Sequence, residues 1–418
     1  MANRAMSDSN VQWMGDIPNN WSVEPIGKLF TERNTKVSDL DFPPLSVTKK
    51  GIVPQLENAA KSKNHNDRKQ VNSGDFVINS RSDRKMSSGL SSLDGSVSLI
   101  NIVLTSKSVF PGYTKYLLKN YGFAEEFYRW GTGIVADLWS TRYERMKRIL
   151  VPYPSYEEQQ KIVAFLDEKV SHIENIIEDT KKSIENLKSY KQSLITETVT
   201  KGLNPNVKMK NSNSVSEGKI PYHWKVAKIG NVTKLQTGTT PTTKKRELFT
   251  GNYNWYTPSD LNNFKLKEST RKLNSMAPEQ GFVPTYPAHS VLVVGIGATI
   301  GKVGYVDHEC SSNQQITALI PNEKIKGKFL AYYMLVNTEI IKNTAQYTTL
   351  PIINNNDLRK ISLIVPPIEE QIEIVKYIDN KTSQINRLIN NKEQLINELE
   401  SYKKSLIYEY VTGKKEVK

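Results

Sequence analysis

The chain contains 418 residues and carries a formal net charge of +14 at pH 7, with an isoelectric point near 9.4. A basic surface of this size favours a polyanionic partner, most often nucleic acid. Cys310 is the only cysteine, which excludes an internal disulfide, and no stretch approaches the roughly 20 apolar residues that a membrane span requires. We therefore expect a cytoplasmic protein of two to four domains that makes no contact with a membrane.

The charge is distributed unevenly along the chain. Two long blocks are basic and the segments that follow them are mildly acidic, a pattern that a uniform surplus of lysine would not produce. The net charges are +6 for residues 1–153, −2 for 154–203, +2 for 204–215, +8 for 216–365, −2 for 366–413 and +2 for 414–418. These ranges predict the domain organisation: a first domain, a first long helix, a linker, a second domain, a second long helix and a basic tail.

Both basic blocks are expected to be mixed α/β and rich in strand. Each contains short β-branched runs between Gly, Ser, Asn and Pro turn formers, and an amphipathic pattern near its end. Strands are predicted at 76–79, 97–104 and 291–296, and helices at 113–128 and 329–344. Residues 204–215 are polar and lack periodicity, which indicates a linker.

The two acidic segments carry the clearest pattern in the chain. Apolar residues recur every seven positions over about five heptads in both copies, which is typical of a coiled coil. We expect helices at 157–199 and 369–411 that pair antiparallel; an ordinary amphipathic helix on a globular core is the alternative. The predicted interface residues are Val163, Leu166, Val170, Ile173, Ile177, Ile184, Leu187, Leu194, Val375, Ile378, Ile385, Ile389, Ile396, Leu399 and Leu406.

Two lysines interrupt this apolar pattern. Lys191 and Lys403 occupy equivalent positions near the C-terminal ends of the two helices. Polar residues at such positions can fix the register of a coiled coil, but the long lysine stems can equally extend out of the seam.

Several short motifs occur twice in the same order, about half a chain apart. They are Ile17–Trp21 and Ile220–Trp224, Glu157–Gln159 and Glu369–Gln371, and Leu187–Ile195 and Leu399–Ile407. A duplicated unit of this size predicts two similar sites in a fixed relation, an arrangement suited to two separated points on one long partner.

No catalytic constellation is found in the sequence. Residues 295–302 resemble a phosphate-binding loop, but only three residues separate Gly297 from Gly301 where four are needed, and Val303 replaces the required Ser or Thr. A strand, a turn and a strand are expected there instead. His308 and Cys310 have no spaced partners that would complete a zinc site. We therefore predict neither a catalytic residue nor a metal site.

Small, polar and cationic loops are the candidate contacts to DNA. Arg81 and Arg84 follow a predicted strand and can each bind guanine bidentately, and Gln314 can pair with adenine. Solvated surface loops and bonds within the fold are the alternative interpretation. The predicted DNA-binding residues are Lys49, Lys50, Arg81, Ser82, Arg84, Lys85, Thr237, Thr239, Thr240, Lys244, Lys245, Arg246, Gln314 and Tyr347.

The combination of motifs resembles the specificity subunits of type I restriction-modification systems over nearly the whole chain. The first-copy helix opening, Pro154–Gln159, departs by one extra residue. The motifs that carry the resemblance are Ile17–Trp21, Ile220–Trp224, Thr237–Pro241, Pro258–Leu261, Gly297–Lys302 with Asn313-Gln314, and Pro367–Gln371.

This resemblance implies an α+β fold in which two target recognition domains, 1–153 and 216–365, are joined by two long antiparallel coiled-coil helices in an internal pseudo-two-fold repeat. Each domain would read half of a split DNA sequence, and the helices would set the gap. The implied partners are double-stranded DNA, two methyltransferase subunits that use S-adenosylmethionine, and restriction-translocase subunits that use ATP and Mg. The chain itself would be non-catalytic and hold no cofactor. A coiled-coil scaffold with non-specific nucleic-acid affinity, or an unrecognised nuclease or methyltransferase, remains open.

Overall fold

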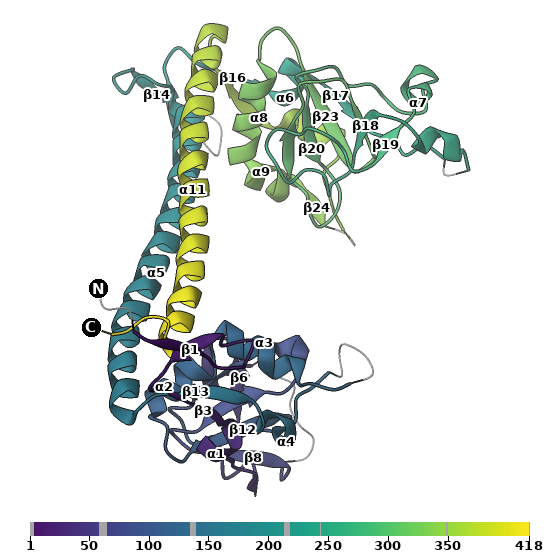
Figure 1. The fold of residues 1–418 in the computed structure, drawn as a ribbon. Helices are drawn as coiled ribbons and strands as arrows, with labels where there is room; N and C mark the ends of the chain where they lie inside the picture. The colour runs from purple at the N-terminus through teal and green to yellow at the C-terminus, as the bar shows by residue number, and fades with distance from the viewer. Residues whose placement is uncertain are drawn as a thin grey trace. The chain divides into compact units, whose positions relative to one another are not determined.

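The chain folds into two compact units in the computed structural model, which describes residues 4–57, 65–133, 139–212, 218–242, 244–347 and 350–417. Unit 1 comprises residues 1–181 and 393–418, and unit 2 comprises residues 182–392. Each unit has a mixed α/β body and contains segments of two long helices, α5 (Tyr156–Lys201) and α11 (Ile368–Val411) (Figure 1). The two predicted helices are thus confirmed to within two residues at each end.

A four-stranded antiparallel sheet with the order β10-β9-β12-β4 forms the centre of unit 1. Its strands are β4 (Phe30–Glu32), β9 (Phe76–Asn79), β10 (Ser88–Leu90) and β12 (Asn101–Ser106). Around it lie β1 (Met6–Asp8), β2 (Asp16–Pro18), β3 (Ser22–Pro25), β5 (Lys36–Val37), β6 (Leu45–Thr48), β7 (Gly51–Pro54), β8 (Arg68–Val71), β11 (Gly95–Ser98) and β13 (Leu150–Tyr153). The helices of the body are α1 (Ile26–Leu29), α2 (Pro111–Leu117), α3 (Tyr121–Arg129) and α4 (Tyr143–Met146).

Both faces of the two central strands, β9 and β12, are largely buried, which explains their apolar runs. Side chains alternate between the faces of a strand. Phe76 and Ile78 therefore join the core formed with α2, α3 and the long helices, while Val77 joins a second core with Val71 and Val97. The turn after β9 consequently follows a strand whose three apolar residues are all buried.

Unit 2 repeats this topology. Its central sheet has the order β21-β20-β23-β17, with strands β17 (Thr233–Thr237), β20 (Val291–Val294), β21 (Val303–Tyr305) and β23 (Ile316–Pro321). The other strands are β14 (Met209–Asn211), β15 (Lys219–Pro221), β16 (Lys225–Lys228), β18 (Tyr253–Tyr256), β19 (Lys272–Leu273), β22 (Ser311–Ser312), β24 (Gln346–Tyr347), β25 (Pro351–Ile352) and β26 (Ser362–Val365). The helices are α6 (Ile229–Val232), α7 (Met276–Glu279), α8 (Gly327–Val336), α9 (Thr338–Thr344) and α10 (Asn355–Lys360).

Four expectations from the sequence need refinement. The single strand expected at 97–104 is two strands, β11 and β12, because a turn interrupts the apolar run at Leu99. The helix expected at 113–128 is also two, α2 and α3, and the side chain of Asn120 caps the second by accepting a hydrogen bond from the backbone N–H of Phe123 (2.9 Å). Likewise α8 and α9 replace the helix at 329–344. The stretch predicted as a linker contains β14, which pairs with β15. The domain boundaries themselves stay a prediction.

Within each unit the two long helices run antiparallel. In unit 1 the Phe165 and Tyr410 rings lie 4.5 Å apart, and the Lys403 ammonium is 3.1 Å from the Glu174 carboxylate. From the first contact to the second, the residue number rises along α5 and falls along α11, so the two helices run in opposite directions. In unit 2 the Lys191 ammonium donates to the amide oxygen of Asn386 at 3.0 Å. Both interrupting lysines therefore bond across to the other helix.

A buried tryptophan ties the body of each unit to both helices. In unit 1 the Trp21 indole N–H donates to Glu158 at the start of α5 (2.8 Å), and Gly413, just past α11, packs on the same ring. In unit 2 the Trp224 indole N–H donates to Glu370 at the start of α11 (2.9 Å), and Gly202, just past α5, packs on that ring. The repeated Ile-Pro-x-x-Trp and Glu-Glu-Gln motifs thus contact each other.

The glutamine of each Glu-Glu-Gln motif makes a second tie. The Gln159 amide oxygen accepts from the backbone N–H of Phe110 at 2.8 Å, and the Gln371 amide oxygen accepts from that of Lys326 at 2.7 Å. Both glutamines are fully buried. Because a buried amide without partners costs about 1–3 kcal/mol, these bonds fix each body against the helix that follows it.

Candidate nucleic-acid interface

The arginine loop, defined as residues 80–87 between β9 and β10, presents two exposed guanidinium groups. Its backbone is held in three places: the Asn79 side chain accepts from the N–H of Arg81 (3.0 Å), the N–H of Ser82 donates to the carbonyl of Trp139 (3.0 Å), and Tyr128 donates to the carbonyl of Asn79 (3.1 Å). The Arg84 side chain is 69% exposed and only 3.5 Å from Asp83. A fixed backbone with extended cations suits contact with phosphates or base edges.

Ser82 and Lys85 lie in the same loop but have partners within the protein. Ser82 opens the short 3₁₀ helix Ser82–Arg84. The Lys85 ammonium pairs with Glu125 and lies 6.0 Å from the centre of the Tyr128 ring. Of the loop's cations, the two arginines are therefore the better candidates for an external partner.

Lys49 and Lys50 lie beside this loop. They form the exposed tip of the β6–β7 hairpin. That hairpin packs on the strand that leaves the arginine loop, since a Cβ added to Gly89 in β10 would lie only 3.0 Å from the Cα of Gly51. The structure thus brings together two of the cationic segments found in the sequence of unit 1.

The threonine turn of unit 2, residues 237–241, is built into the fold. The hydroxyl groups of Thr237 and Thr317 are 3.0 Å apart, and the Asn355 amide donates to Thr237 (2.9 Å). The carbonyl of Thr239 accepts from the Trp255 indole (3.0 Å). Gly238 is required here because any Cβ would lie 2.3 Å from backbone oxygens. The Thr237 hydroxyl and the Thr239 carbonyl thus bond within the fold, although all three threonines are exposed, and the Thr240 hydroxyl donates to the exposed Gln314.

The Pro258–Leu261 motif also has a structural role. The Asp260 carboxylate accepts from the backbone N–H groups of Thr257 (2.8 Å) and Thr270 (2.9 Å) and from both their hydroxyls. Burial tends to raise the pKa of Asp260, but these hydrogen bonds outweigh it and lower the pKa below its ordinary value. This motif organises a loop, and its aspartate is committed within the protein.

Lys244, Lys245 and Arg246 form an exposed cationic segment of unit 2. The Lys245 ammonium lies 4.3 Å from the centre of the Phe282 ring, and Arg246 begins the short 3₁₀ helix Arg246–Phe249. Tyr347 lies in β24, and its side chain falls outside the described residues. Among the residues that the structure describes, no hydrogen bond joins this cationic segment to Gln314.

No sequence motif indicates that the β20–β21 turn, residues 295–302, is the counterpart of the arginine loop. The expected strand, turn and strand are present, because β20 and β21 pair antiparallel. The turn joins the two strands of unit 2 that correspond to β9 and β10 of unit 1. Only the order of strands in the sheet identifies this correspondence, because the two loops have no sequence in common.

The described residues contain no group of three or more His, Cys, Asp or Glu side chains placed to hold a metal ion. Burial raises the pKa of the Cys310 thiol, so this cysteine stays protonated and is a poor nucleophile. Among the described helices, none is both long and apolar enough to cross a membrane.

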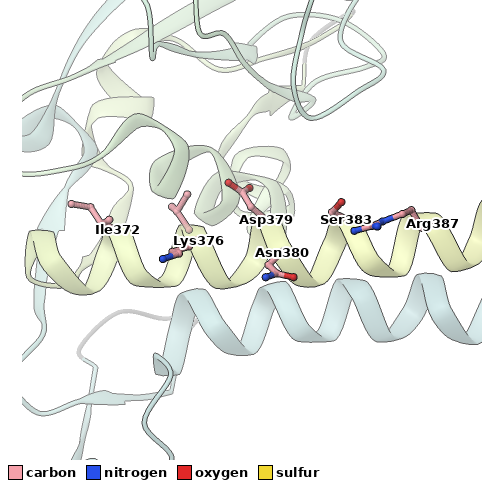
Figure 2. Close-up of a pocket in the computed structure, with 7 residues that line it drawn as sticks. Ile372, Lys376, Asp379, Asn380, Ser383 and Arg387 are labelled. Carbon is pink, nitrogen blue, oxygen red and sulfur yellow. The ribbon is translucent and has the colours of Figure 1, made fainter.

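A groove of about 630 Å³ follows one face of α11 in unit 2. Ile372, Asp379, Ser383 and Arg387 lie along it (Figure 2). Asp379 is already bound by the Lys328 ammonium (2.6 Å) and the Tyr332 hydroxyl (2.7 Å) of α8. The rest of the groove is lined by Val375, Lys376 and Asn380.

The predicted coiled-coil residues are all buried or half-buried on the two long helices. Half-buried positions are Leu187, Val375, Ile396 and Leu399, and the buried ones are Val163, Leu166, Val170, Ile173, Ile177, Ile184, Leu194, Ile378, Ile385, Ile389 and Leu406. Leu399 and Ile396 of α11 pack on the same core as Ile173 and Ile177 of α5.

Truncating Ile177 to alanine is expected to lower the free energy of unfolding of unit 1 by about 2 kcal/mol. This is at the low end for a core residue, because two packed helices can move together and partly fill the cavity. Urea denaturation followed by circular dichroism measures this change. Leu395→Ala, on the same pair of helices but 40% exposed, is the control and should change stability by less than about 0.5 kcal/mol. Equal effects of the two substitutions would show that Ile177 is not a seam residue.

The chain is similar in sequence to a known protein family and to several of its members. Residues 221–401 match the family model described as the type I restriction modification DNA specificity domain. The chain is 28% identical over 171 residues to the MjaIX specificity subunit of Methanocaldococcus jannaschii, which covers 39% of each chain. It is 25% identical over 252 residues to the EcoR124I/EcoR124II specificity subunit of Escherichia coli, covering 58% of this chain and 57% of that one. The matched stretch therefore spans well under two thirds of either relative.

Solved structures show the same fold over nearly the full length. A chain from the structure described as complex assembly and conformational transition of the type I R-M system superposes with a TM-score of 0.75 at 18% identity, covering 94% of this chain and 98% of that one. The HsdS subunit from Thermoanaerobacter tengcongensis gives a TM-score of 0.58 at 18% identity, covering 95% and 98%. The α+β fold with two domains joined by long helices is confirmed.

Proposed function

We propose that this chain, which belongs to the specificity subunits of type I restriction-modification systems, reads a bipartite DNA sequence through its two units. One observation carries the proposal: the same sheet order occurs twice, and in each unit the same pair of strands presents a loop at its end. Cationic residues supply affinity through phosphates, and loop side chains supply specificity through base edges. The long helices set the gap between the two half-sites.

The chain is proposed to be the non-catalytic member of its complex and to act in the cytoplasm. Methylation and cleavage would be carried out by two methyltransferase subunits and by restriction-translocase subunits, which would hold S-adenosylmethionine, ATP and Mg. The α11 groove supports such docking, because it lies open on a helix whose opposite face, including Ile374, Ile378 and Ile385, is buried. A scaffold with non-specific affinity, the alternative function, would show no preference for a split sequence.

The readout by unit 1 is tested by substitution in the arginine loop. Methylome sequencing of a host that carries this chain with its partners first identifies the target. Arg81→Ala or Arg84→Ala is then expected to weaken binding to that target by about 1–3 kcal/mol, with little effect on random DNA, because a bidentate contact to guanine is lost. Fluorescence anisotropy with labelled duplexes at fixed salt measures both affinities.

Lys244→Ala and Lys245→Ala serve as the contrast. They should weaken binding to specific and random DNA alike and reduce the salt dependence, because lysine contacts phosphates. Lys161→Ala is the control, since this exposed lysine pairs with Glu157 on α5 and belongs to none of the candidate loops. Equal losses on specific and random DNA for every arginine variant would overturn direct readout by the arginine loop.

A further inference from the structure

The β20–β21 turn of unit 2 and the arginine loop of unit 1 occupy the same place in their sheets. Each connects the edge strand of a four-stranded antiparallel sheet to the strand beside it. Each also makes an isolated antiparallel β-bridge at its first residues, Arg81 with Ser140 and Ile296 with Ile352. Two independent features of the fold therefore give these turns the same setting.

The chemistry of the two tips differs completely. Ala298 and Thr299 are the exposed residues of the unit 2 turn, whereas Ile300 beside them is 6% exposed. Lys302, the only cation of the turn, donates to the amide oxygen of Asn262 at 2.9 Å. Where unit 1 presents guanidinium groups, unit 2 thus presents two short side chains that each end in a methyl group.

The backbone of the unit 2 turn is held as firmly as that of the arginine loop. Gly297 has a φ of +100° and Gly301 a φ of +86°, which favour glycine at both positions. The N–H of Gly295 donates to the carbonyl of Gln315 (2.8 Å), and the N–H of Gly297 to that of Pro351 (3.0 Å). A narrow, fixed tip with small side chains can approach a base edge closely.

Gln314 adds a polar group on the segment that holds the base of this turn, where its amide oxygen accepts from the Thr240 hydroxyl. Its exposed side chain precedes Gln315, whose carbonyl holds the turn. In the major groove adenine binds glutamine bidentately, and the thymine C5 methyl packs on Ala or on the methyl of Thr. Together these two contacts match one A·T base pair.

We propose that Ala298 and Thr299 are specificity-determining residues that contact a thymine methyl in the half-site of unit 2, while Gln314 pairs with the adjoining adenine edge. The proposal rests on the proposed function and deepens it. The two half-sites would then differ chemically. The arginine loop would bind guanine in the half-site of unit 1, and the β20–β21 turn would contact an A·T pair in the half-site of unit 2.

Deoxyuridine provides the test, because it differs from thymidine only by the missing C5 methyl. Each thymine of the identified target is replaced singly by deoxyuridine, and binding of the full-length chain is measured by anisotropy. One replacement in the unit 2 half-site should weaken binding about fourfold, the effect of burying one methyl group. The double variant Ala298→Gly, Thr299→Ser should bind the normal target more weakly and lose this sensitivity. Arg81→Ala should keep it.

The outcomes separate this inference from the function on which it rests. If the chain binds no split sequence in preference to random DNA, the proposed function fails. If it binds one, but no thymine in the unit 2 half-site is sensitive to deoxyuridine, or the double variant keeps the full sensitivity, the inference alone is wrong. Thermal melting followed by circular dichroism verifies that both variants are folded.

Discussion

Replacing Trp224 with alanine is expected to lower the free energy of unfolding of unit 2 by about 3–5 kcal/mol. The side chain is fully buried, its ring supports Gly202, and its indole N–H is bound by Glu370. The substitution leaves a large cavity and removes the tie between the body and the two helices. Urea denaturation should show one of the two units unfolding at markedly lower denaturant while the other is little changed.

Two matched variants dissect this effect. Trp224→Phe keeps most of the ring but loses the N–H donor, so it should cost less than the alanine variant. Tyr222→Ala removes an aromatic side chain two residues away that is 58% exposed, and it should cost less than about 0.5 kcal/mol. If the alanine variant is as stable as the wild type, the tryptophan does not hold the unit together.

Lengthening both helices by one heptad is expected to abolish tight binding to the original target. Insertions after Thr180 and after Lys392 preserve the seven-residue pattern and add about 10 Å of helix, close to three base pairs at ~3.4 Å each. The insertion also rotates one unit about the DNA axis. Any target that is still bound should retain both half-site sequences and differ only in the gap, which selection from a library of variable gaps would reveal.

The matched control is seven Gly and Ser residues inserted after Gly218. This glycine precedes β15, and a Cβ there would meet no atom within 4 Å. The control adds seven residues to the chain without lengthening either helix, so the original target should still be bound. The idea of a helical spacer does not survive if the heptad variant binds the original site, with its original gap, at undiminished affinity.

The sequence predicted features whose pattern is local and repeated. A heptad needs only its own spacing to be recognised, so α5 and α11 were placed to within two residues. Contacts between distant segments left no such pattern. The bond from Trp21 to Glu158 joins residues 137 positions apart. The two motifs were recognised separately, but nothing in either one indicates the other as its partner.

The candidate site was predicted less completely, for a related reason. Arg81 and Arg84 stand out because exposed cations after a strand are a chemical signal. Ala298 and Thr299 carry no such signal, and only the order of strands in the sheet identifies their turn as a counterpart. Thr237 lies in a turn-rich motif that predicts a DNA contact, and its hydroxyl also bonds to Thr317 and Asn355 within the fold, so its role as a contact stays a prediction. Loop chemistry alone cannot distinguish a residue that faces a ligand from one that closes a turn.

Unit 1 is built from two segments that are far apart in the sequence, and this affects the order in which the protein folds. Its core includes Leu406, Tyr410 and Val411 from the end of the chain, and the Tyr113 hydroxyl donates to the carbonyl of Val411, 298 residues later. Contacts this distant form late, because the intervening chain must first be closed into a loop. Unit 2 is a single continuous segment and can fold while synthesis is still in progress. The N-terminal body of unit 1 cannot complete its core until residues 406–411 have been synthesised, so the apolar surface that they cover stays exposed longer than the core of unit 2.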